Sequence, residues 1–253
     1  MMNEKIKVSV VSYLNSKPFI HGLEQDFMKD LIEISQDIPS VCAQKLLEDQ
    51  VDVGLVPVAV IPGLKEHHII SDYCIGAVGK VNSVMLYSNV PLNEIKTILL
   101  DYQSRSSVAL TRVLAAFFWN IQPEWKETAS DYEHLISGNT AAVVIGDRTF
   151  GMENKYVYSY DLAEEWQKNT SLPFVFACWV SNKKLPSGFL PMFNKALKFG
   201  IDAREGLAAE IQSNNKYQTD VFYYLNNSIS YDFDHPKKRA LELFLDYTRK
   251  LGL

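Results

Sequence analysis

The chain has 253 residues, of which 47% are hydrophobic and 22% are charged, and its formal net charge is −5. A chain of this length can bury a substantial core, either as one large domain or as two smaller lobes. The negative charge argues against a nucleic-acid-binding surface, which usually needs a basic stripe. The run of three basic residues at 237–239 is interpreted instead as a solvent-exposed helix start.

Neither a membrane span nor a secretory signal is apparent. No apolar run approaches the ~20 residues needed to cross a bilayer, and residues 1–7 lack a long apolar stretch and a cleavage site. Cys42, Cys74 and Cys178 are widely spaced in apolar surroundings, which is typical of buried free thiols in a reducing compartment. We therefore expect a cytoplasmic protein that has neither a membrane nor a nucleic acid as its partner.

Hydrophobic patterning predicts strands and helices that alternate through most of the chain. In chain order, it predicts a strand at residues 5–12, a helix at 18–23, a strand at 31–35, a helix at 40–47 capped by Ser40, a strand at 51–58, a pair of strands at 73–78 and 83–87, a strand at 97–100, a helix with an apolar stripe at 110–118, a short helix at 130–137, a strand at 141–145, a helix at 161–170, a strand at 172–180, and helices at 189–211, 220–226 and 236–251. This alternation implies α/β layers in which mainly parallel sheets are flanked by helices.

The chain contains no tandem repeat or low-complexity linker, so a second lobe would have to be inserted within the first. The turn at residues 88–92 and the apolar run at 174–180 are the segments expected to cross between lobes. We therefore predict a discontinuous first lobe made of residues 1–90 and 181–253, an inserted second lobe made of residues 91–180, and a ligand cleft between them.

Two short polar loops carry most of the functional information. Residues 12–18 (Ser-Tyr-Leu-Asn-Ser-Lys-Pro) and 101–107 (Asp-Tyr-Gln-Ser-Arg-Ser-Ser) each follow an apolar strand and lead into a predicted helix. Hydroxyls, an amide and free backbone N–H groups at the start of a helix form a site for a small anion. Two such loops indicate a ligand with two anionic groups, held between two lobes.

Several familiar chemistries are disfavoured by what the motifs lack. His67 and His68 are adjacent and cannot both face one ion from a helix, and the chain has no C-x-x-C pair, so we expect no metal. The Gly79-Lys80 pair lacks the flanking glycines and the following Ser or Thr of a phosphate-binding loop. G-x-S-x-G, the signature of a hydrolase nucleophile elbow, is also absent.

What remains is a set of polar residues at predicted strand ends: Ser12, Asn15, Ser83, Ser104, Ser106, Ser107 and Asp147. A serine in such a place often only caps a helix. Several of them in both predicted lobes nevertheless favour a ligand cleft. The residues by themselves therefore indicate a two-lobed binder of a small carboxylate, and they leave open whether chemistry follows binding.

The motifs resemble those of the chorismate dehydratases of the futalosine route to menaquinone. The segments that carry the resemblance are 10–18 (V-V-S-Y-L-N-S-K-P), 52–57 (D-V-G-L-V-P), 76–84 (G-A-V-G-K-V-N-S-V), 101–110 (D-Y-Q-S-R-S-S-V-A-L), 145–147 (I-G-D) and 161–179 (D-L-A-E-E-W-Q-K-N-T-S-L-P-F-V-F-A-C-W). They span nearly the whole chain in order. Ser106 and Ser171 depart from the family pattern, which would have Thr and Gly there.

The resemblance implies a two-lobed fold like that of type II periplasmic binding proteins, used here for catalysis. It implies loss of water from chorismate to give 3-[(1-carboxyvinyl)oxy]benzoate, by a monomer or homodimer without a cofactor. By motif, Asn15 and Ser83 would lie nearest the reacting ring. The remaining expected substrate-binding residues are Ser12, Tyr13, Ser104, Arg105, Ser106, Ser107, Gly146 and Asp147. Of these, the three serines at 104, 106 and 107 would cradle a carboxylate.

No His, Glu or Lys stands at the motif positions nearest the ring, so the proton acceptor is open. One hypothesis is that a carboxylate of chorismate takes the proton while Asn15 and Ser83 stabilise the developing charge; Asp147 is the acidic alternative. Two rival functions share the fold. One is a non-catalytic carboxylate-binding protein, and the other is the 1,4-dihydroxy-6-naphthoate synthase of the same route, which we expect to carry a histidine in its cleft.

Overall fold

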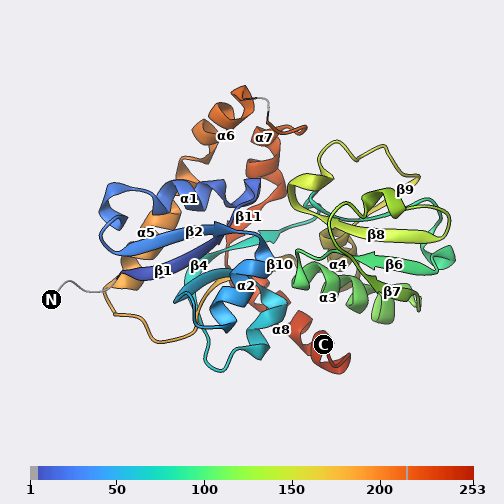
Figure 1. Ribbon diagram of the computed structural model, residues 1–253, viewed down its shortest axis with the longest axis horizontal. Helices are drawn as coiled ribbons and strands as arrows, with labels where there is room; N and C mark the ends of the chain where they lie inside the picture. Colours follow the sequence, from blue (N-terminus) through green and yellow to red (C-terminus); the bar gives the residue numbers. More distant parts are fainter. Residues whose placement is uncertain (1–4, 215) are drawn as a thin grey trace.

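Two β-sheets lie side by side in the computed structural model (Figure 1). The structure describes residues 5–214 and 216–253. Residues 1–4, at the start of the predicted first lobe, and residue 215 lie outside the described residues. One sheet has six strands in the order β11-β4-β10-β3-β1-β2, and the other has five in the order β7-β6-β8-β5-β9.

The six-stranded sheet is built from both ends of the chain. Its strands are β1 (Ile6–Val11), β2 (Ile32–Asp37), β3 (Val53–Pro57), β4 (His68–Ala77), β10 (Phe174–Ser181) and β11 (Ser230–Asp232). β1 pairs in parallel with β2 and β3, whereas β10 runs antiparallel between β3 and β4. Every residue of β10 is buried, which explains its uninterrupted apolar sequence.

The five-stranded sheet comes from the middle of the chain. Its strands are β5 (Val84–Ser88), β6 (Thr97–Leu100), β7 (Glu124–Glu127), β8 (Thr140–Ile145) and β9 (Tyr158–Asp161). β6 pairs in parallel with β7 and β8, whereas β5 is antiparallel to β8 and β9. The carboxyl ends of β6 and β8 therefore lie at the same edge of this sheet.

The predicted α/β class is confirmed, but both sheets are mixed rather than mainly parallel. β4 and β5, predicted as a pair, belong to different sheets, and β10 belongs to the six-stranded sheet. The chain therefore passes between sheets at residues 78–83 and again between residues 170 and 174, not at the predicted limits 90/91 and 180/181. An apolar run indicates that a strand is buried, but it does not reveal which neighbour the strand pairs with.

Helices cover both sheets (Figure 1). They are α1 (Lys17–Leu23), α2 (Pro39–Leu47), α3 (Arg105–Leu114), α4 (Leu162–Thr170), α5 (Phe189–Asp202), α6 (Arg204–Ser213), α7 (Val221–Tyr223) and α8 (His235–Lys250). The helix predicted at 189–211 is two helices, and the one predicted at 130–137 is only the short 3₁₀ turn Glu133–Leu135. α2 begins one residue before Ser40, which is therefore not its cap.

The backbones of α1 and α5 touch, and this contact places the first polar loop. A Cβ on Gly22 would lie 1.9 Å from the carbonyl oxygen of Ala196, and one on Gly200 would lie 1.8 Å from that of Pro18. Only glycine fits at both positions, because a side chain would push the helices apart. The loop at residues 12–16 is therefore held against the six-stranded sheet by a close helix pair.

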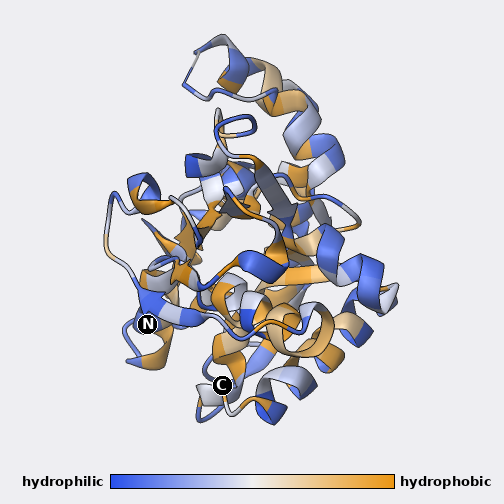
Figure 2. Cartoon of the chain, turned by 90° about the vertical axis from the view of Figure 1, so that its right-hand side faces the viewer, coloured by the Kyte–Doolittle hydropathy of each residue, from blue (hydrophilic) through white to orange (hydrophobic). Residues whose placement is uncertain are grey.

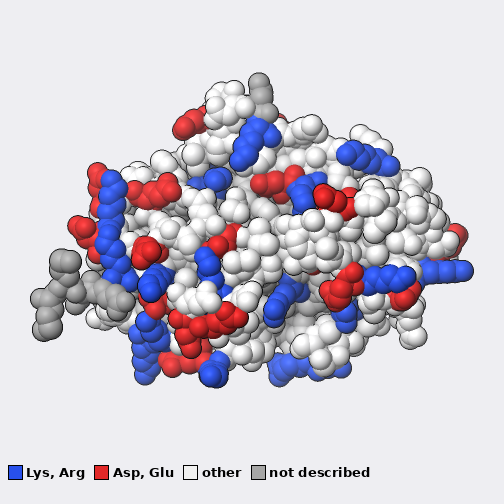
Figure 3. All heavy atoms as spheres, viewed as in Figure 1, with Lys and Arg blue, Asp and Glu red and all other residues white. Residues whose placement is uncertain are grey.

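The distribution of residues between the interior and the surface agrees with most of the expectations from composition. Apolar segments concentrate on the strands and on the sheet-facing sides of the helices (Figure 2). The three cysteines are buried and free, as predicted. On the face seen in Figure 3, acidic and basic side chains are interspersed. Lys237 is an exception to the predicted exposed helix start: it is 1% exposed, and a Cβ on Gly76 would lie 3.2 Å from its methylene chain.

Candidate active site

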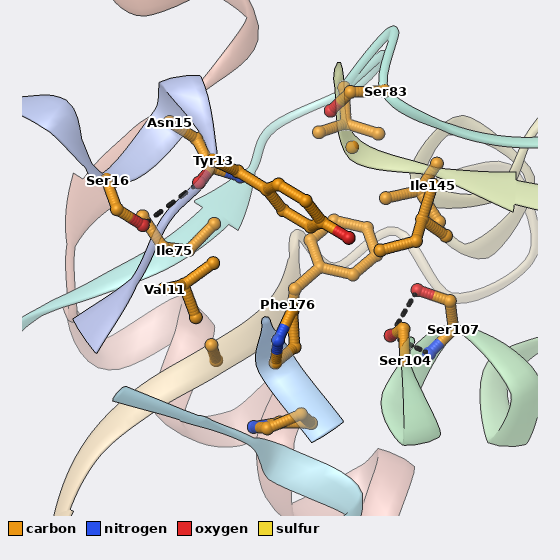
Figure 4. A pocket seen from close by; sticks show the side chains of 16 residues that line it. Val11, Tyr13, Asn15, Ser16, Ile75, Ser83, Ser104, Ser107, Ile145 and Phe176 are labelled. Atoms are coloured by element: carbon orange, nitrogen blue, oxygen red, sulfur yellow. Dashed lines mark hydrogen bonds between the residues drawn. The ribbon is translucent and has the colours of Figure 1, made fainter. Parts of the chain in front are cut away.

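A cavity lies between the two sheets (Figure 4). Its polar lining comes from both sides and consists of Tyr13, Asn15, Ser16, Ser83, Ser104 and Ser107. Among residues 5–214 and 216–253, no Asp, Glu, His, Lys or Arg lines it. A concave, mostly apolar site with a few convergent polar groups is typical of small-molecule binding.

The rest of the wall is apolar, and sequence patterning did not predict it. Val11, Ile75 and Phe176 line the cavity from the six-stranded sheet, and the ring of Phe176 faces it (Figure 4). Ile145, at the end of β8, lines it from the five-stranded sheet. Aromatic and branched aliphatic walls exclude water and strengthen the polar interactions made inside. The cavity can therefore hold a flat or cyclic apolar body whose polar substituents reach the serines and Asn15.

Asn15 lies in a tight turn between β1 and α1. Residues Leu14–Ser16 form a 3₁₀ turn, and the Ser16 hydroxyl donates to the Asn15 side-chain oxygen at 3.0 Å. The Tyr231 hydroxyl donates to the Asn15 backbone carbonyl at 2.9 Å. Because the amide oxygen is already occupied, the Asn15 NH₂ group supplies the free donors of this loop.

Ser83 lies where the chain enters the five-stranded sheet. The backbone N–H groups of Val81 and Asn82 donate to the Asp161 carboxylate at 2.9 and 2.7 Å, and the Gly146 N–H donates to the Ser83 carbonyl at 2.8 Å. Burial raises the pKa of Asp161 to about 6, and four backbone donors oppose that rise. These bonds fix the Ser83 backbone, and its side chain faces the cavity.

Ser104 and Ser107 of the second loop make different hydrogen bonds and have different roles. Ser104 caps α3: its Oγ accepts from the Ser107 N–H at 3.2 Å and donates to the Ser107 Oγ at 2.9 Å. The Ser107 hydroxyl proton is therefore left to donate into the cavity. Together with the first N–H groups of α3, it forms a pre-oriented set of donors for an anion.

Four of the predicted site residues do not line the cavity. The Ser106 hydroxyl accepts from the Ala59 N–H at 3.1 Å, which ties α3 to the six-stranded side. Arg105 is exposed, and the Ser12 N–H donates to the Asp37 carbonyl at 2.9 Å. Asp147 lies behind the wall, where its carboxylate accepts from the Leu14 N–H at 3.1 and 3.3 Å. Gly146, by contrast, lines the cavity.

Tyr13 spans the cavity from the first loop to the five-stranded sheet. Its ring extends toward Ile145 (Figure 4), and its hydroxyl donates to the side-chain oxygen of Gln103. Gly146 has φ +67°, and a Cβ there would lie 2.7–2.9 Å from the Tyr13 ring. Burial raises the pKa of the Tyr13 phenol, so it remains a neutral donor. A side chain from one lobe thus packs directly against the backbone of the other.

A buried ionic network supports the second loop, and sequence reasoning did not predict it. The Asp101 carboxylate accepts from the Gln103 N–H at 2.8 Å and the Tyr132 hydroxyl at 2.7 Å, and it pairs with Arg148. Burial raises the pKa of Asp101, and Arg148 opposes the rise. Asp101 belongs to the second polar loop, and Arg148 belongs to the 3₁₀ turn that follows β8. No local sequence pattern shows that these two segments meet.

Two sheets with a cavity between them are typical of a periplasmic-binding-protein-like fold, and solved structures agree. Protein AF1704 from Archaeoglobus fulgidus is similar at a TM-score of 0.73 and 14% identity, over 100% of this chain and 99% of that one. A Candida albicans protein described as having the generic periplasmic binding protein fold is similar at a TM-score of 0.62 and 15% identity, over 98% and 94%. The predicted fold is therefore confirmed.

The chain belongs to a family described by the term menaquinone biosynthesis, whose model matches residues 6–250. Two curated relatives are chorismate dehydratases. The one from Thermus thermophilus is 24% identical over 92% of this chain and 92% of its own length. The one from Campylobacter jejuni is 25% identical over 95% and 92%. The family resemblance predicted from the motifs is confirmed.

The described residues offer neither a membrane-spanning helix nor a metal-binding cluster. No described helix is long and apolar enough to cross a membrane. Within the same part of the chain, no three His, Cys, Asp or Glu side chains are grouped to hold a metal ion.

Proposed function

We propose that this protein removes water from chorismate to form 3-[(1-carboxyvinyl)oxy]benzoate. The observation that carries the proposal is the cavity between the sheets, whose polar groups are neutral and come from the motif loops. Full-length relatives that are chorismate dehydratases support it. We also propose that the protein acts in the cytoplasm, as a monomer or homodimer without a cofactor; its three buried free thiols fit a reducing compartment.

One carboxylate of chorismate matches the end of the cavity formed by the second loop. Ser107 and the start of α3, capped by Ser104, would hold one carboxylate through charge-assisted hydrogen bonds. The ring would lie against Phe176 and Ile145, with its reacting edge toward Asn15 and Ser83. This placement puts the apolar part of the substrate on the apolar wall.

The elimination then needs one C–H and one C–O bond to break. The ring carbon loses its proton to a base, the C–H electron pair forms the new ring double bond, and the neighbouring hydroxyl leaves as hydroxide and is protonated to water. Aromatisation of the ring drives the reaction. Asn15 and Ser83 would donate to the oxygens on which negative charge develops. Exclusion of water from the cavity by the bound substrate would strengthen both interactions.

The base is proposed to be a carboxylate of chorismate itself. The supporting observation is that no ionisable carboxylate, imidazole or amine lines the cavity within the described part of the chain. Asp147 is the alternative, because burial raises its pKa to about 6, in the range useful for a general base. Its carboxylate, however, accepts from the Leu14 N–H behind the wall.

Incubation of the purified protein with chorismate tests the proposal, with product followed by its aromatic absorbance and mass. We expect formation of the enolpyruvyl benzoate, together with its loss in Ser83→Ala. Tight binding of chorismate without turnover would instead indicate a carboxylate-binding protein. Turnover of a cyclised futalosine, but not of chorismate, would indicate the naphthoate synthase.

A further inference from the structure

One fully buried tyrosine lies behind the cavity wall and contacts the side chain of Ser83, one of the two proposed catalytic residues. Tyr224 is 2% exposed, and its hydroxyl donates to the Ser83 Oγ at 2.8 Å. Burial raises the pKa of this phenol, while hydrogen bonds with the Ser83 and Asn15 side chains offset part of the rise. Tyr224 is therefore a neutral donor at any pH at which the protein is expected to work.

This hydrogen bond decides which way the Ser83 hydroxyl can donate. A serine hydroxyl has one proton and two lone pairs. A phenol is the stronger acid of the two hydroxyls, so Tyr224 is the donor and Ser83 the acceptor. One lone pair of Ser83 is thereby occupied from behind, and the Ser83 proton remains available on the cavity side. A donor that is oriented before substrate arrives does not have to reorganise during the reaction.

Asn15 extends the same arrangement to the first loop. Its amide oxygen accepts from the Ser16 hydroxyl at 3.0 Å, which leaves the NH₂ group as the donor of this side chain. Ser83 and Asn15 thus each accept a hydrogen bond from a protein hydroxyl and keep a proton to donate.

The segment that carries Tyr224 is built to reach this position. Tyr224 begins a π-helical turn, Tyr224–Ser228, in which the Ile229 N–H donates to the Tyr224 carbonyl at 3.2 Å. π-Helical turns are rare and occur frequently at functional sites. At the other end of the turn, the Ser228 hydroxyl accepts from the Asn82 side chain at 2.8 Å. The turn is therefore docked twice onto the Ser83 loop.

The edge of the Phe150 ring packs against Tyr224, with ring centroids 5.2 Å apart and planes at 80°. Phe150 follows the 3₁₀ turn Gly146–Thr149, so Tyr224 is clamped between the six-stranded side and the loop after β8. This packing limits the tyrosine to one position relative to Ser83.

We propose that Tyr224 is a positioning residue for the dehydration: it orients the Ser83 hydroxyl as a donor toward the substrate. The inference rests on the proposed function. Tyr224 lies 141 positions from Ser83 in the sequence and does not line the cavity.

The test is a double-mutant cycle of Ser83→Ala and Tyr224→Phe, with Tyr87→Phe as a matched control. Tyr87 is also a buried tyrosine, 2% exposed, on the strand that follows Ser83, and it does not line the cavity. We expect Tyr224→Phe to lower kcat about 10- to 100-fold, less than the roughly 10²- to 10³-fold cost of removing a direct donor. KM for chorismate should change less than threefold, and Tyr87→Phe should leave kcat unchanged.

In the Ser83→Ala background, Tyr224→Phe should have little further effect, because the hydroxyl that it orients is already gone. An equal additional loss of kcat in that background would overturn the inference, as would an unchanged kcat in Tyr224→Phe alone. All variants are assayed well below the lowest Tm, and a loss explained by unfolding would appear as a lower Tm and a smaller active fraction. Failure of the unmodified protein to convert chorismate would contradict the proposed function instead.

Discussion

The two polar loops look alike in sequence, yet the structure uses them differently. Each follows the carboxyl end of a strand and leads into a helix. In the second loop, Ser104 caps α3 and leaves the Ser107 hydroxyl and the first N–H groups for a ligand. In the first loop, the Leu14 N–H already donates to a protein carboxylate, that of Asp147.

The difference follows from the length and capping of the two helices. α3 has ten residues and a serine cap, so its start is a rigid donor set that suits a carboxylate. α1 has seven residues, and within the described chain Ser16 makes no capping side-chain bond at its start. The side chains of the first loop are therefore free for other work, with Asn15 facing the cavity and Tyr13 crossing it. We therefore propose that the second loop binds the substrate carboxylate and that the first loop takes part in the chemistry.

The sharpest test of this division is removal of the Asn15 amide. Asn15→Ala should lower kcat by roughly 10²- to 10³-fold, the range seen when one donor to a developing negative charge is lost. KM should change little, because the carboxylate-binding loop is untouched. Steady-state kinetics with chorismate measures both parameters. Full turnover at saturating chorismate would show that the first loop does not face the chemistry.

A second test breaks the contact that joins the loops. Gly146→Ala would place a Cβ 2.7–2.9 Å from the Tyr13 ring, so Tyr13 must shift. A misplacement of about 1 Å in a closed site can cost up to about 100-fold, and we expect kcat/KM to fall about 10- to 100-fold. Gly138→Ala is the matched control, because Gly138 also has positive φ, +52°, but its Cβ would meet nothing within 4 Å.

The control separates packing from backbone strain. Both alanines carry the cost of a left-handed backbone, about 1–2 kcal/mol of unfolding free energy, and Gly146→Ala adds the cost of displacing the Tyr13 ring. Only Gly146→Ala should lose activity. Equal activity losses in the two variants would contradict the prediction that the contact between Gly146 and Tyr13 supports activity.

A third test separates the two serines of the binding loop. Ser107→Ala should raise KM about tenfold with kcat nearly unchanged, because one hydrogen bond to a charged group contributes about 1.5–3 kcal/mol at most. Ser104→Ala removes the helix cap and should also cost about 1 kcal/mol of unfolding free energy. Chemical denaturation and chorismate titration measure the two effects. A fall in kcat for Ser107→Ala would place it among the groups nearest the chemistry.

Sequence patterns predicted the features that depend on neighbouring residues. The strand expected at 97–100 is β6, Thr97–Leu100, and both polar loops lie where their strand–loop–helix patterns put them. The serines and Asn15 on the cavity wall came from the same local reasoning. These features are set by periodicity and capping within a dozen residues, which a single sequence displays.

Features set by distant partners could not be predicted in this way. Tyr224 meets Ser83 across 141 positions, and Phe176 lines the cavity only because β10 crosses back between β3 and β4. The apolar run of β10 has no visible alternation, so nothing in it shows which side chains face a ligand. The ion pair of Asp101 and Arg148 could not be predicted for the same reason, because the two residues follow different strands.

The smallest expected effect concerns Asp147, whose carboxylate accepts a hydrogen bond from the Leu14 N–H of the first loop. Burial raises the pKa of this carboxyl from 3.8 to about 6, so between those values the folded chain binds a proton more tightly than the unfolded chain. The contribution of Asp147 to the free energy of unfolding is therefore most favourable below about pH 4, falls as pH rises to about 6, and is constant above that. Asp147→Asn should remove this slope.

The kcat of Asp147→Asn shows whether Asp147 is the catalytic base. If the substrate carboxylate is the base, Asp147→Asn should lose only a few-fold in kcat, far less than the roughly 10²- to 10⁴-fold contribution of a general base. Any inflection of kcat near pH 6 should then persist in the variant. Disappearance of that inflection together with a loss of 100-fold or more would make Asp147 the proton acceptor. The first loop would then hold its catalytic base through the Leu14 N–H, and the two loops would differ in the anion that each one binds, a protein carboxylate in one and a substrate carboxylate in the other.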